Sequence, residues 1–376
     1  MKIRRLIAMN VPIKNCNLRC HYCYITAQNQ VESGPAVFSY SPEHVAKCLS
    51  VERLGGPCII NLTGGGETMI PPELPSYIRA LLDEGHYLEI VTNGTVSKRF
   101  EEIAAFPGEL LSHLEFKFSL HYLELKRLQM LETFAANVRL MRDSGCSYTI
   151  ECTPTDELEP YIDELKAYCL DNFGALCQLT IARDDLNGSK EILSGRSFGQ
   201  YCKVWEQFDS TMFAFKRDIY LRKCPEFCYA GCWSLYVDMG SGRAKPCYGQ
   251  MSDQNIFEDP AAPIRFDPVG KHCRQPYCYN GHAFLALGCI PELDTPTYSD
   301  IRNRVCSDGT EWEYHDLKEA FSAKLYDANE VWDEKKKNRY ERTYIARIVK
   351  TAAKDMPEII DKIKARLQLI RVSRWG

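Results

Sequence analysis

The chain has 376 residues, 45% of them hydrophobic and 26% charged, with a formal net charge of −4. These values suit one large folded domain with a smaller appendage, and the negative charge argues against a general nucleic-acid binder. No apolar run reaches the roughly 20 residues of a membrane helix. The first apolar stretch is broken at Pro12 and is too short for a secretory signal. We therefore expect a cytoplasmic protein without a membrane span.

Alternating strand and helix patterns occupy residues 1–185. Six runs rich in β-formers predict strands over residues 6–11, 58–63, 87–92, 115–120, 147–152 and 177–182. Amphipathic segments between them predict helices over residues 41–55, 74–83, 97–105, 123–143 and 156–172. Six such units predict an α/β fold, a parallel sheet curled into a partial (β/α)6 TIM-like barrel. Its active site is expected at the carboxyl ends of the strands.

The rest of the chain divides into three predicted parts. Residues 186–223 suggest a helical linker, residues 224–310 are rich in cysteine, and residues 311–376 predict a helical extension. Residues 234–238, followed by Gly240-Ser241-Gly242, predict a β-hairpin. From Lys335 onward there are 13 Lys and Arg against 4 Asp and Glu. We interpret this basic tail as the solvated face of terminal helices split at Pro357, with phosphate-bearing substrates, RNA or an anionic membrane as alternative partners.

Eighteen cysteines are the compositional anomaly. In a large chain of a reducing compartment, clustered cysteines more often hold metal or perform redox chemistry than form disulfides. Seven scattered cysteines lie among apolar residues, and we interpret them as core thiols: Cys48, Cys58, Cys146, Cys152, Cys169, Cys177 and Cys202.

Cys16, Cys20 and Cys23 follow the first predicted strand with C-x3-C-x2-C spacing. Three thiolates on one short loop can ligate three irons of a cubane and leave the fourth iron open. An open iron can chelate the amino and carboxylate groups of a small molecule. The alternative is a zinc loop.

At this point the sequence resembles the radical S-adenosylmethionine (SAM) superfamily, and the match continues in chain order. Gly64-Gly65-Gly66-Glu67, at the end of the second strand, resembles the family's GGE motif, where backbone groups meet the SAM amino group; only glycine permits such a close approach. Thr92-Asn93 matches the position of ribose contacts, and Tyr22 the aromatic residue beside the adenine. Further SAM contacts that the resemblance implies are Ser119, Glu151 and Arg183.

The resemblance implies that a [4Fe–4S] cluster, reduced by a flavodoxin- or ferredoxin-type donor, cleaves SAM. The 5′-deoxyadenosyl radical so formed abstracts a hydrogen atom from a substrate. The protein must hold that substrate close to the radical and exclude solvent.

The C-terminal cysteines suggest a second metal site. Cys228-x3-Cys232, a hydrophobic strand and Cys247 resemble the start of SPASM or twitch domains, which bind auxiliary [4Fe–4S] clusters. Cys228 and Cys232 are both possible as first ligand, and Cys273 with Cys278 can complete the site. We expect one auxiliary cluster, with a four-thiolate zinc site as the alternative.

For the substrate, we expect a small or carrier-bound metabolite such as a sugar or cyclic alcohol, undergoing dehydrogenation or epimerisation. In epimerisation a thiol returns a hydrogen atom, and Cys289 or Cys306 is a candidate. The second hypothesis is a ribosomal-peptide maturase that forms a thioether or carbon–carbon crosslink. It is disfavoured because the first strand begins within a few residues of Met1 and leaves no room for a leader-binding winged helix. The third is a non-catalytic iron–sulfur or zinc protein.

Overall fold

The computed structural model describes residues 2–28, 30–186, 188–250 and 254–344. The chain separates into two compact units, residues 1–330 and residues 331–376. In the second unit the described helix is α14 (Glu334–Arg342), which Asp333 caps by accepting a hydrogen bond from the Lys336 amide. The predicted terminal helices around Pro357, and Arg371 to Arg374, lie outside the described residues.

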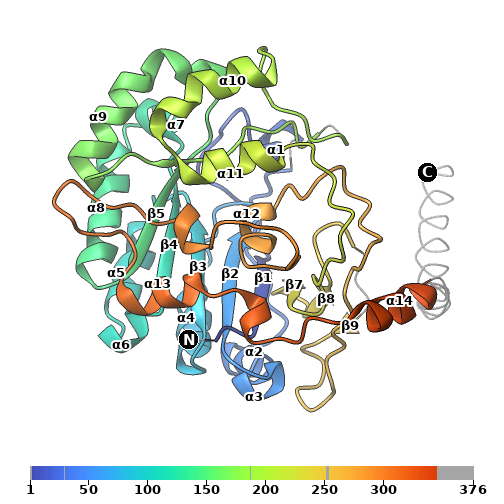
Figure 1. The fold of residues 1–376 in the computed structure, drawn as a ribbon. Coiled ribbons are helices and arrows are strands. Elements are labelled where there is room, and N and C mark those ends of the chain that lie inside the picture. Colours follow the sequence, from blue (N-terminus) through green and yellow to red (C-terminus); the bar gives the residue numbers. More distant parts are fainter. Residues whose placement is uncertain (1, 29, 187, 251–253, 345–376) are drawn as a thin grey trace, which may run out of the picture. The chain divides into compact units, whose positions relative to one another are not determined.

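One sheet organises the first unit (Figure 1). In the described residues it has nine strands in the order β6-β5-β4-β3-β2-β1-β7-β8-β9, and neighbours from β6 to β7 run parallel. The strands are β1 (Arg5–Val11), β2 (Cys58–Gly64), β3 (Tyr87–Thr92), β4 (Leu114–Ser119), β5 (Ser147–Cys152), β6 (Gln178–Leu179), β7 (Ser234–Asp238), β8 (Arg243–Lys245) and β9 (Gln254–Asn255). The predicted parallel α/β architecture is therefore confirmed.

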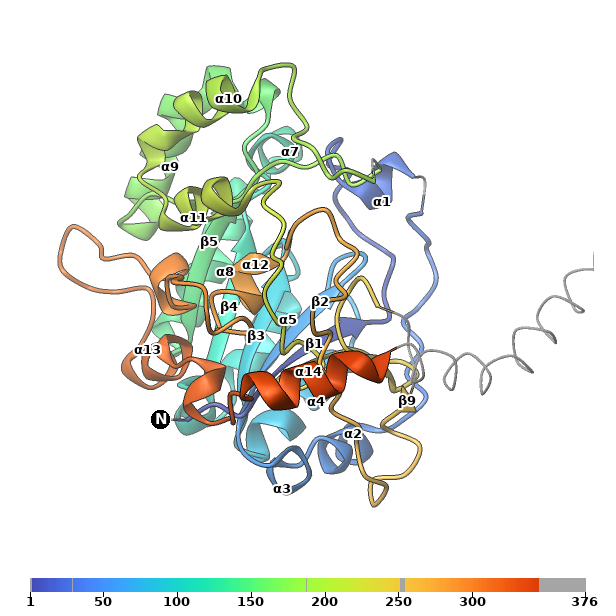
Figure 2. The ribbon, with the colours of Figure 1, turned by 45° about the vertical axis from the view of Figure 1, so that its right-hand side comes forward.

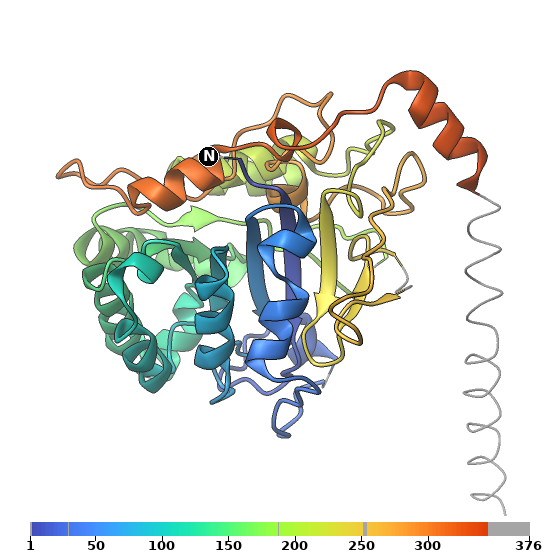
Figure 3. The same cartoon turned by 90° about the horizontal axis from the view of Figure 1, so that it is seen from below.

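Helices follow the strands and cover the outer face of the sheet (Figure 3). Those of the barrel are α1 (Tyr24–Ala27), α2 (Pro42–Cys48), α3 (Val51–Leu54), α4 (Leu74–Asp83), α5 (Ser97–Ala104), α6 (Gly108–Leu111), α7 (Tyr122–Arg127), α8 (Leu131–Asp143) and α9 (Ile162–Phe173). Later in the unit come α10 (Phe198–Trp205), α11 (Thr211–Ile219), α12 (Gly281–Phe284) and α13 (His315–Ser322). None of the described helices is long and apolar enough to cross a bilayer.

Three predicted helices are interrupted, each for a local reason. Residues 41–55 form α2 and α3 because Ser50 accepts a hydrogen bond from the Arg53 amide and caps a new start. Residues 123–143 break where Gln129 takes a φ of 57° and ends α7. Residues 156–161 form a 3₁₀ helix that contains Pro160, which lacks the amide proton of an α-helical hydrogen bond.

The two faces of the sheet differ in chemistry. On β4, Phe116 and Phe118 pack against Phe100 of α5, with ring centroids 5.3 and 5.5 Å apart. Side chains alternate along a strand, so Glu115, Lys117 and Ser119 face the other side. Asn61, Glu89 and Glu115 are adjacent in register and share this inner face. The barrel therefore has an apolar outer layer and a polar interior.

The predicted hairpin of the cysteine-rich region is present as β7 and β8, and it continues the barrel's sheet. Leu6 of β1 pairs with Ser234 of β7, and Asn10 with Asp238. This pairing satisfies the edge of β1 that would otherwise present unpaired backbone groups. The predicted boundary at residue 223 consequently falls inside one compact unit.

Candidate active site

A cavity of about 260 Å³ opens at the carboxyl ends of β1 to β4, and we call it the Cys-loop cavity. The loop after β1 supplies Cys16, Cys20 and Cys23 to its wall, and the ends of the next three strands supply most of the other predicted residues. Those residues are Gly64, Gly65, Gly66, Glu67, Thr92, Asn93 and Ser119. The structure thus gathers on one wall residues that span a hundred positions of sequence.

The glycine triplet holds the cysteine loop. The Gly66 amide donates to the Ile13 carbonyl at 2.9 Å, and the Glu67 amide donates to the Asn15 carbonyl at 2.8 Å. A Cβ at Gly66 would stand 2.0 Å from the Asn15 oxygen, and one at Gly64 would stand 2.6 Å from Ile13 Cγ2. We predicted a close approach to a ligand; the approach that the structure records is to the backbone of the loop that carries the cysteines.

Glu67 joins the ends of β2 and β3. Its buried carboxylate accepts hydrogen bonds from Thr92 Oγ1 at 2.6 Å, the Asn93 amide at 2.7 Å and the Met69 amide at 2.9 Å. Burial raises the pKa of Glu67, and these hydrogen bonds oppose the increase. Asn93 Nδ2 in turn donates to Asn17 Oδ1 at 2.9 Å, which connects this network to the cysteine loop.

The donor set of the loop consists of three thiols close enough to affect one another. Burial, together with the neighbouring Cys23 and Cys16 thiols, raises the pKa of Cys20 to about 12. Burial likewise raises the pKa of Cys16. Thiolates are the ligands of iron–sulfur clusters, and a bound cation offsets the cost of their charge. Across the described ranges, no three His, Cys, Asp or Glu side chains surround one point as ligands of a single ion would; a cubane instead takes each thiolate on a separate iron.

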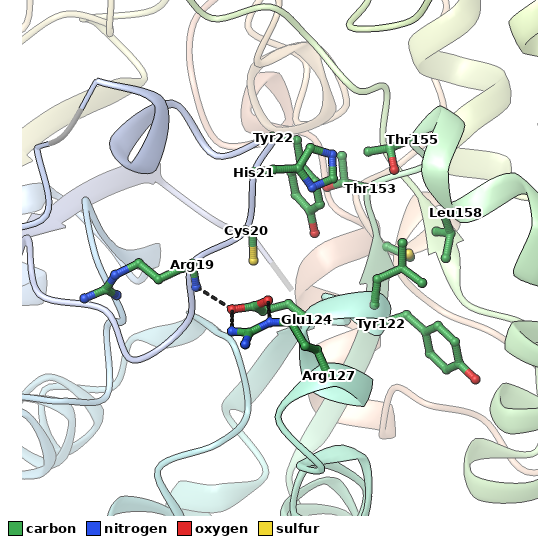
Figure 4. Close-up of a pocket in the computed structure, with 12 residues that line it drawn as sticks. Arg19, Cys20, His21, Tyr22, Tyr122, Glu124, Arg127, Thr153, Thr155 and Leu158 are labelled. Carbon is green, nitrogen blue, oxygen red and sulfur yellow. Dashed lines mark hydrogen bonds and ion pairs between the residues drawn. The ribbon is translucent and has the colours of Figure 1, made fainter.

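Tyr22 does not line the Cys-loop cavity; it lines a second cavity of about 250 Å³, the outer cavity (Figure 4). Cys20 borders both cavities, and Glu124 closes the outer one by accepting hydrogen bonds from the Arg19 amide and Arg127. Tyr24, which we did not single out, lines the Cys-loop cavity instead. The placement of Tyr22 beside an adenine stays a prediction.

Glu151 and Arg183 do not line the Cys-loop cavity. Glu151 forms ion pairs with Lys117 at 2.9 Å and Arg302 at 3.1 Å. Burial alone would raise its pKa, but Lys117, Lys216 and Arg302 lower the pKa of Glu151 to about 2. Arg183 pairs with Asp185 at 3.3 Å and donates to the Tyr279 carbonyl at 2.9 Å. Their roles as SAM contacts stay predictions.

Five C-terminal thiols lie near one another. Burial raises the pKa of Cys278, and four other thiols raise it further: Cys247, Cys228, Cys224 and Cys273. Burial also raises the pKa of Cys247, to about 11. This group contains Cys224, which sequence analysis passed over because it precedes the motif. Cys232 instead interacts with Cys289 and Arg5, whose guanidinium donates to the Cys232 carbonyl.

Neither proposed hydrogen-atom donor lies at the Cys-loop cavity. Cys289 is fully buried beside Cys228, Cys247 and Ser234. The Cys306 thiol contacts the Phe173 carbonyl, at 3.3 Å, where α9 ends before β6 begins. Cys306 therefore lies toward the amino ends of the strands, away from the cysteine loop.

The N-terminal half of this barrel matches a known protein family. Residues 10–116 match the family model described as the Radical SAM superfamily. No curated protein sequence matches the chain. Among solved structures, SuiB of Streptococcus suis bound to S-adenosylmethionine aligns with a TM-score of 0.50 and 16% identity, over 70% of this chain and 66% of that one.

Two further solved structures align with the chain at similarly low identity. The anSMEcpe structure with AdoMet and a Cp18Cys peptide aligns with a TM-score of 0.49 and 16% identity, over 96% of this chain and 99% of that one. BtrN in complex with AdoMet and 2-DOIA aligns with a TM-score of 0.31 and 15% identity, over 69% and 81%. This chain spans about two thirds of the length of SuiB, and at such identities the likeness is one of fold.

Proposed function

Because residues 10–116 form a radical SAM domain and the chain is a radical SAM enzyme, we propose that it abstracts a hydrogen atom from a small or carrier-bound metabolite. Dehydrogenation or epimerisation of a sugar-like or alcohol-like carbon would follow. The observation that carries the proposal is the common wall formed by Cys16, Cys20, Cys23 and the ends of β2, β3 and β4.

Each residue of this wall has a distinct task in the proposal. The three cysteines would hold the cluster, and the backbone amides of Gly66 and Glu67 keep their loop in place through the hydrogen bonds to Ile13 and Asn15. When bound, the cluster and SAM supply a 5′-deoxyadenosyl radical. Asn93 and Ser119 would offer polar groups toward SAM, and the buried Ile25 and half-buried Val91 form part of an apolar wall that would exclude water. A flavodoxin- or ferredoxin-type protein would supply the electron.

The proposal is tested by anaerobic assay of the reconstituted protein with SAM, dithionite and candidate metabolites. We expect 5′-deoxyadenosine from the wild type and none from Cys16→Ala, Cys20→Ala or Cys23→Ala. Cys202→Ala, in the buried part of α10, is the matched control and should cleave SAM normally. Undiminished cleavage by the three loop variants, or zinc in place of iron at the loop, would refute the proposal.

The same assay identifies the substrate. Deuterium transferred from a labelled metabolite into 5′-deoxyadenosine marks the carbon that is attacked. Formation of deoxyadenosine only in the presence of a peptide would instead favour a ribosomal-peptide maturase that forms a thioether or carbon–carbon crosslink.

We also propose one auxiliary cluster at the C-terminal thiols. Its ligands would come from Cys224, Cys228, Cys247, Cys273 and Cys278, whose mutual effects on pKa indicate that they lie close together. A cluster with four thiolate ligands can conduct electrons, as dehydrogenation requires, whereas zinc cannot. Iron analysis and electron paramagnetic resonance of the reconstituted protein distinguish the two metals.

A further inference from the structure

A group of cations lies inside the first unit, beside the Cys-loop cavity. Lys117 comes from β4, Arg183 follows β6, Lys216 lies on α11, and Arg302 follows a 3₁₀ helix over Ser299–Ile301. We call these four residues the basic cluster. Lys117 and Lys216 are each 9% exposed and Arg302 is 1% exposed, so the cluster is shielded from bulk solvent.

The carboxylates of this region are shared among several cations. Glu151 pairs with Lys117 and Arg302, and Glu89 pairs with Arg302 at 3.1 Å. Asp185 pairs with both Arg183 and Lys190, at 3.3 Å each. Four cations thus share three carboxylates, and Lys216 adds a fifth cation, which leaves an excess of positive charge in a region of low dielectric constant.

Lys216 is the member of the basic cluster that the carboxylates compensate least. Its ammonium group donates a hydrogen bond to the Thr180 hydroxyl, and no ion pair among the described residues includes it. Burial lowers the pKa of Lys216 to about 7, and Glu151 only partly opposes the decrease. A buried ammonium without a carboxylate within ion-pair distance is costly, and an anionic ligand would remove that cost.

The surroundings of His282, on α12, give independent evidence of the same positive potential. Its Nδ1 atom is buried and has no hydrogen-bond partner. Burial lowers its pKa well below the usual range, and all four cations of the basic cluster lower it further. The imidazole is therefore neutral and offers a hydrogen-bonding nitrogen to a group that the protein itself does not supply.

The position of the cluster connects it to the active site. Ser119, which lines the Cys-loop cavity, is in register with Glu151 on the next strand, and Glu151 binds the cluster's Lys117. Helix α11 packs on β6, α12 packs on α11, and Figures 1 and 2 show α11 above the ends of the strands. The basic cluster thus lies between this cover and β4, whose Ser119 lines the cavity.

We propose that the basic cluster binds a carboxylate or phosphate group of the substrate, with Lys216 as the principal charged ligand and His282 as a hydrogen-bonding partner. The inference rests on the proposed function, because it places the anionic end of the substrate beside the cavity where the radical would form. The proposed anion site restricts the substrate class to anionic metabolites, or to metabolites joined to a carrier through a phosphate.

The test uses the reconstituted holoenzyme with inorganic phosphate and, separately, acetate as probes. Anaerobic titration calorimetry measures binding, and melting temperatures are compared with chloride at equal ionic strength. The variants are Lys216→Met and Lys216→Arg, with Lys203→Met on the exposed face of α10 as matched control.

We expect one probe to bind saturably to the wild type and to the control. Lys216→Met should bind that probe at least about tenfold more weakly, as loss of a charge-assisted hydrogen bond predicts, and Lys216→Arg should retain binding. Melting temperatures without the probe establish that each variant is folded. Equal affinity in Lys216→Met would overturn the inference.

SAM cleavage is measured on the same samples, so that the two proposals fail separately. A wild type that cleaves SAM but binds neither phosphate nor acetate would overturn the anion site alone. A wild type that binds phosphate through Lys216 but never forms 5′-deoxyadenosine would overturn the proposed function.

Discussion

The Tyr22 hydroxyl and Nδ1 of His121 stand 2.6 Å apart. Tyr22 lines the outer cavity and His121 the Cys-loop cavity, so this hydrogen bond forms part of the partition between the two. Burial lowers the pKa of His121 to about 4, which keeps the imidazole neutral at physiological pH. A neutral imidazole can accept a hydrogen bond from the Tyr22 hydroxyl at Nδ1, and the imidazole's own hydrogen is then on Nε2.

We predict that Tyr22→Phe destabilises the protein by about 1–3 kcal/mol, because it leaves a buried nitrogen without its partner. Urea unfolding of the reduced, metal-free protein measures this free energy. Tyr122→Phe is the control: its hydroxyl donates to Glu164, whose side chain is 49% exposed and can bond to water instead. The loss there should be smaller than about 1 kcal/mol. Equal losses in the two variants would contradict the role given to the Tyr22–His121 pair.

Gly66→Ala should loosen the cysteine loop. The added Cβ would meet the Asn15 carbonyl oxygen at 2.0 Å, so the loop backbone must move. Such overpacking typically costs about 1–3 kcal/mol, and the displaced loop should retain less iron after reconstitution. Gly34→Ala is the matched control, because nothing lies within 4 Å of its Cβ position. Normal iron content and melting temperature in Gly66→Ala would show that the triplet does not hold the loop.

The local elements of the barrel could be predicted from sequence because their signals are local. The β3 and β5 strands match their predicted ranges residue for residue, since β-branched and aromatic runs are bounded by turn residues. The Cys-loop cavity could also be predicted, because the carboxyl ends of consecutive parallel strands meet at one edge.

The features that could not be predicted from sequence depend on contacts between segments that lie far apart along the chain. The alignment of β7 with β1 joins residues more than 220 positions apart, and no local pattern specifies it. The same holds for Arg302, which reaches Glu89 and Glu151 from a 3₁₀ turn in the C-terminal region. Tyr22 and Tyr24 have similar sequence contexts, and only the backbone path decides which one faces the cavity.

The ligands proposed for the auxiliary cluster can be tested by comparing the iron content of cysteine variants. Cys278→Ser and Cys224→Ser should each lower the iron content by about four atoms per chain if one cubane is lost. Cys232→Ser should retain iron, because the thiols that most affect the pKa of Cys278 are Cys247, Cys228, Cys224 and Cys273. Iron analysis of the three reconstituted variants is the measurement. Loss of iron from Cys232→Ser with normal iron in Cys224→Ser would favour the ligand set read from the sequence motif.

Three buried carboxyl groups surround Arg302: Glu89, Glu115 and Glu313. Arg302 pairs with Glu89, whereas neither oxygen of Glu115 has a hydrogen-bond partner. Burial raises the pKa of Glu115 well above its usual value, and it raises the pKa of Glu313 to about 8. These two groups therefore stay protonated in the folded protein at a pH at which they would ionise in the unfolded chain.

The sign of the resulting pH dependence follows from proton counting. Above about pH 4.5 the unfolded chain releases the Glu313 proton, whereas the folded protein keeps it until about pH 8. The folded state binds more protons in this window, so its stability falls as the pH rises, by at most about 1.4 kcal/mol per pH unit for one group. The Glu313→Gln side chain does not titrate, so no proton is released at this position on unfolding. Its amide oxygen can still accept the hydrogen bond from the Ser299 hydroxyl.

We expect Glu313→Gln to gain stability relative to the wild type as the pH rises from 5.5 to 7.5. Urea unfolding at both pH values gives the difference. Glu311→Gln is the control: hydrogen bonds from Lys318 and Asn303 lower the pKa of Glu311, so this carboxyl is ionised in the folded and the unfolded state throughout this window. Its stability difference from the wild type should therefore not change with pH. A difference between Glu313→Gln and the wild type that does not change with pH would mean that Glu313 is ionised in the folded protein, and Arg302 would then neutralise Glu313 in addition to Glu89 and Glu151.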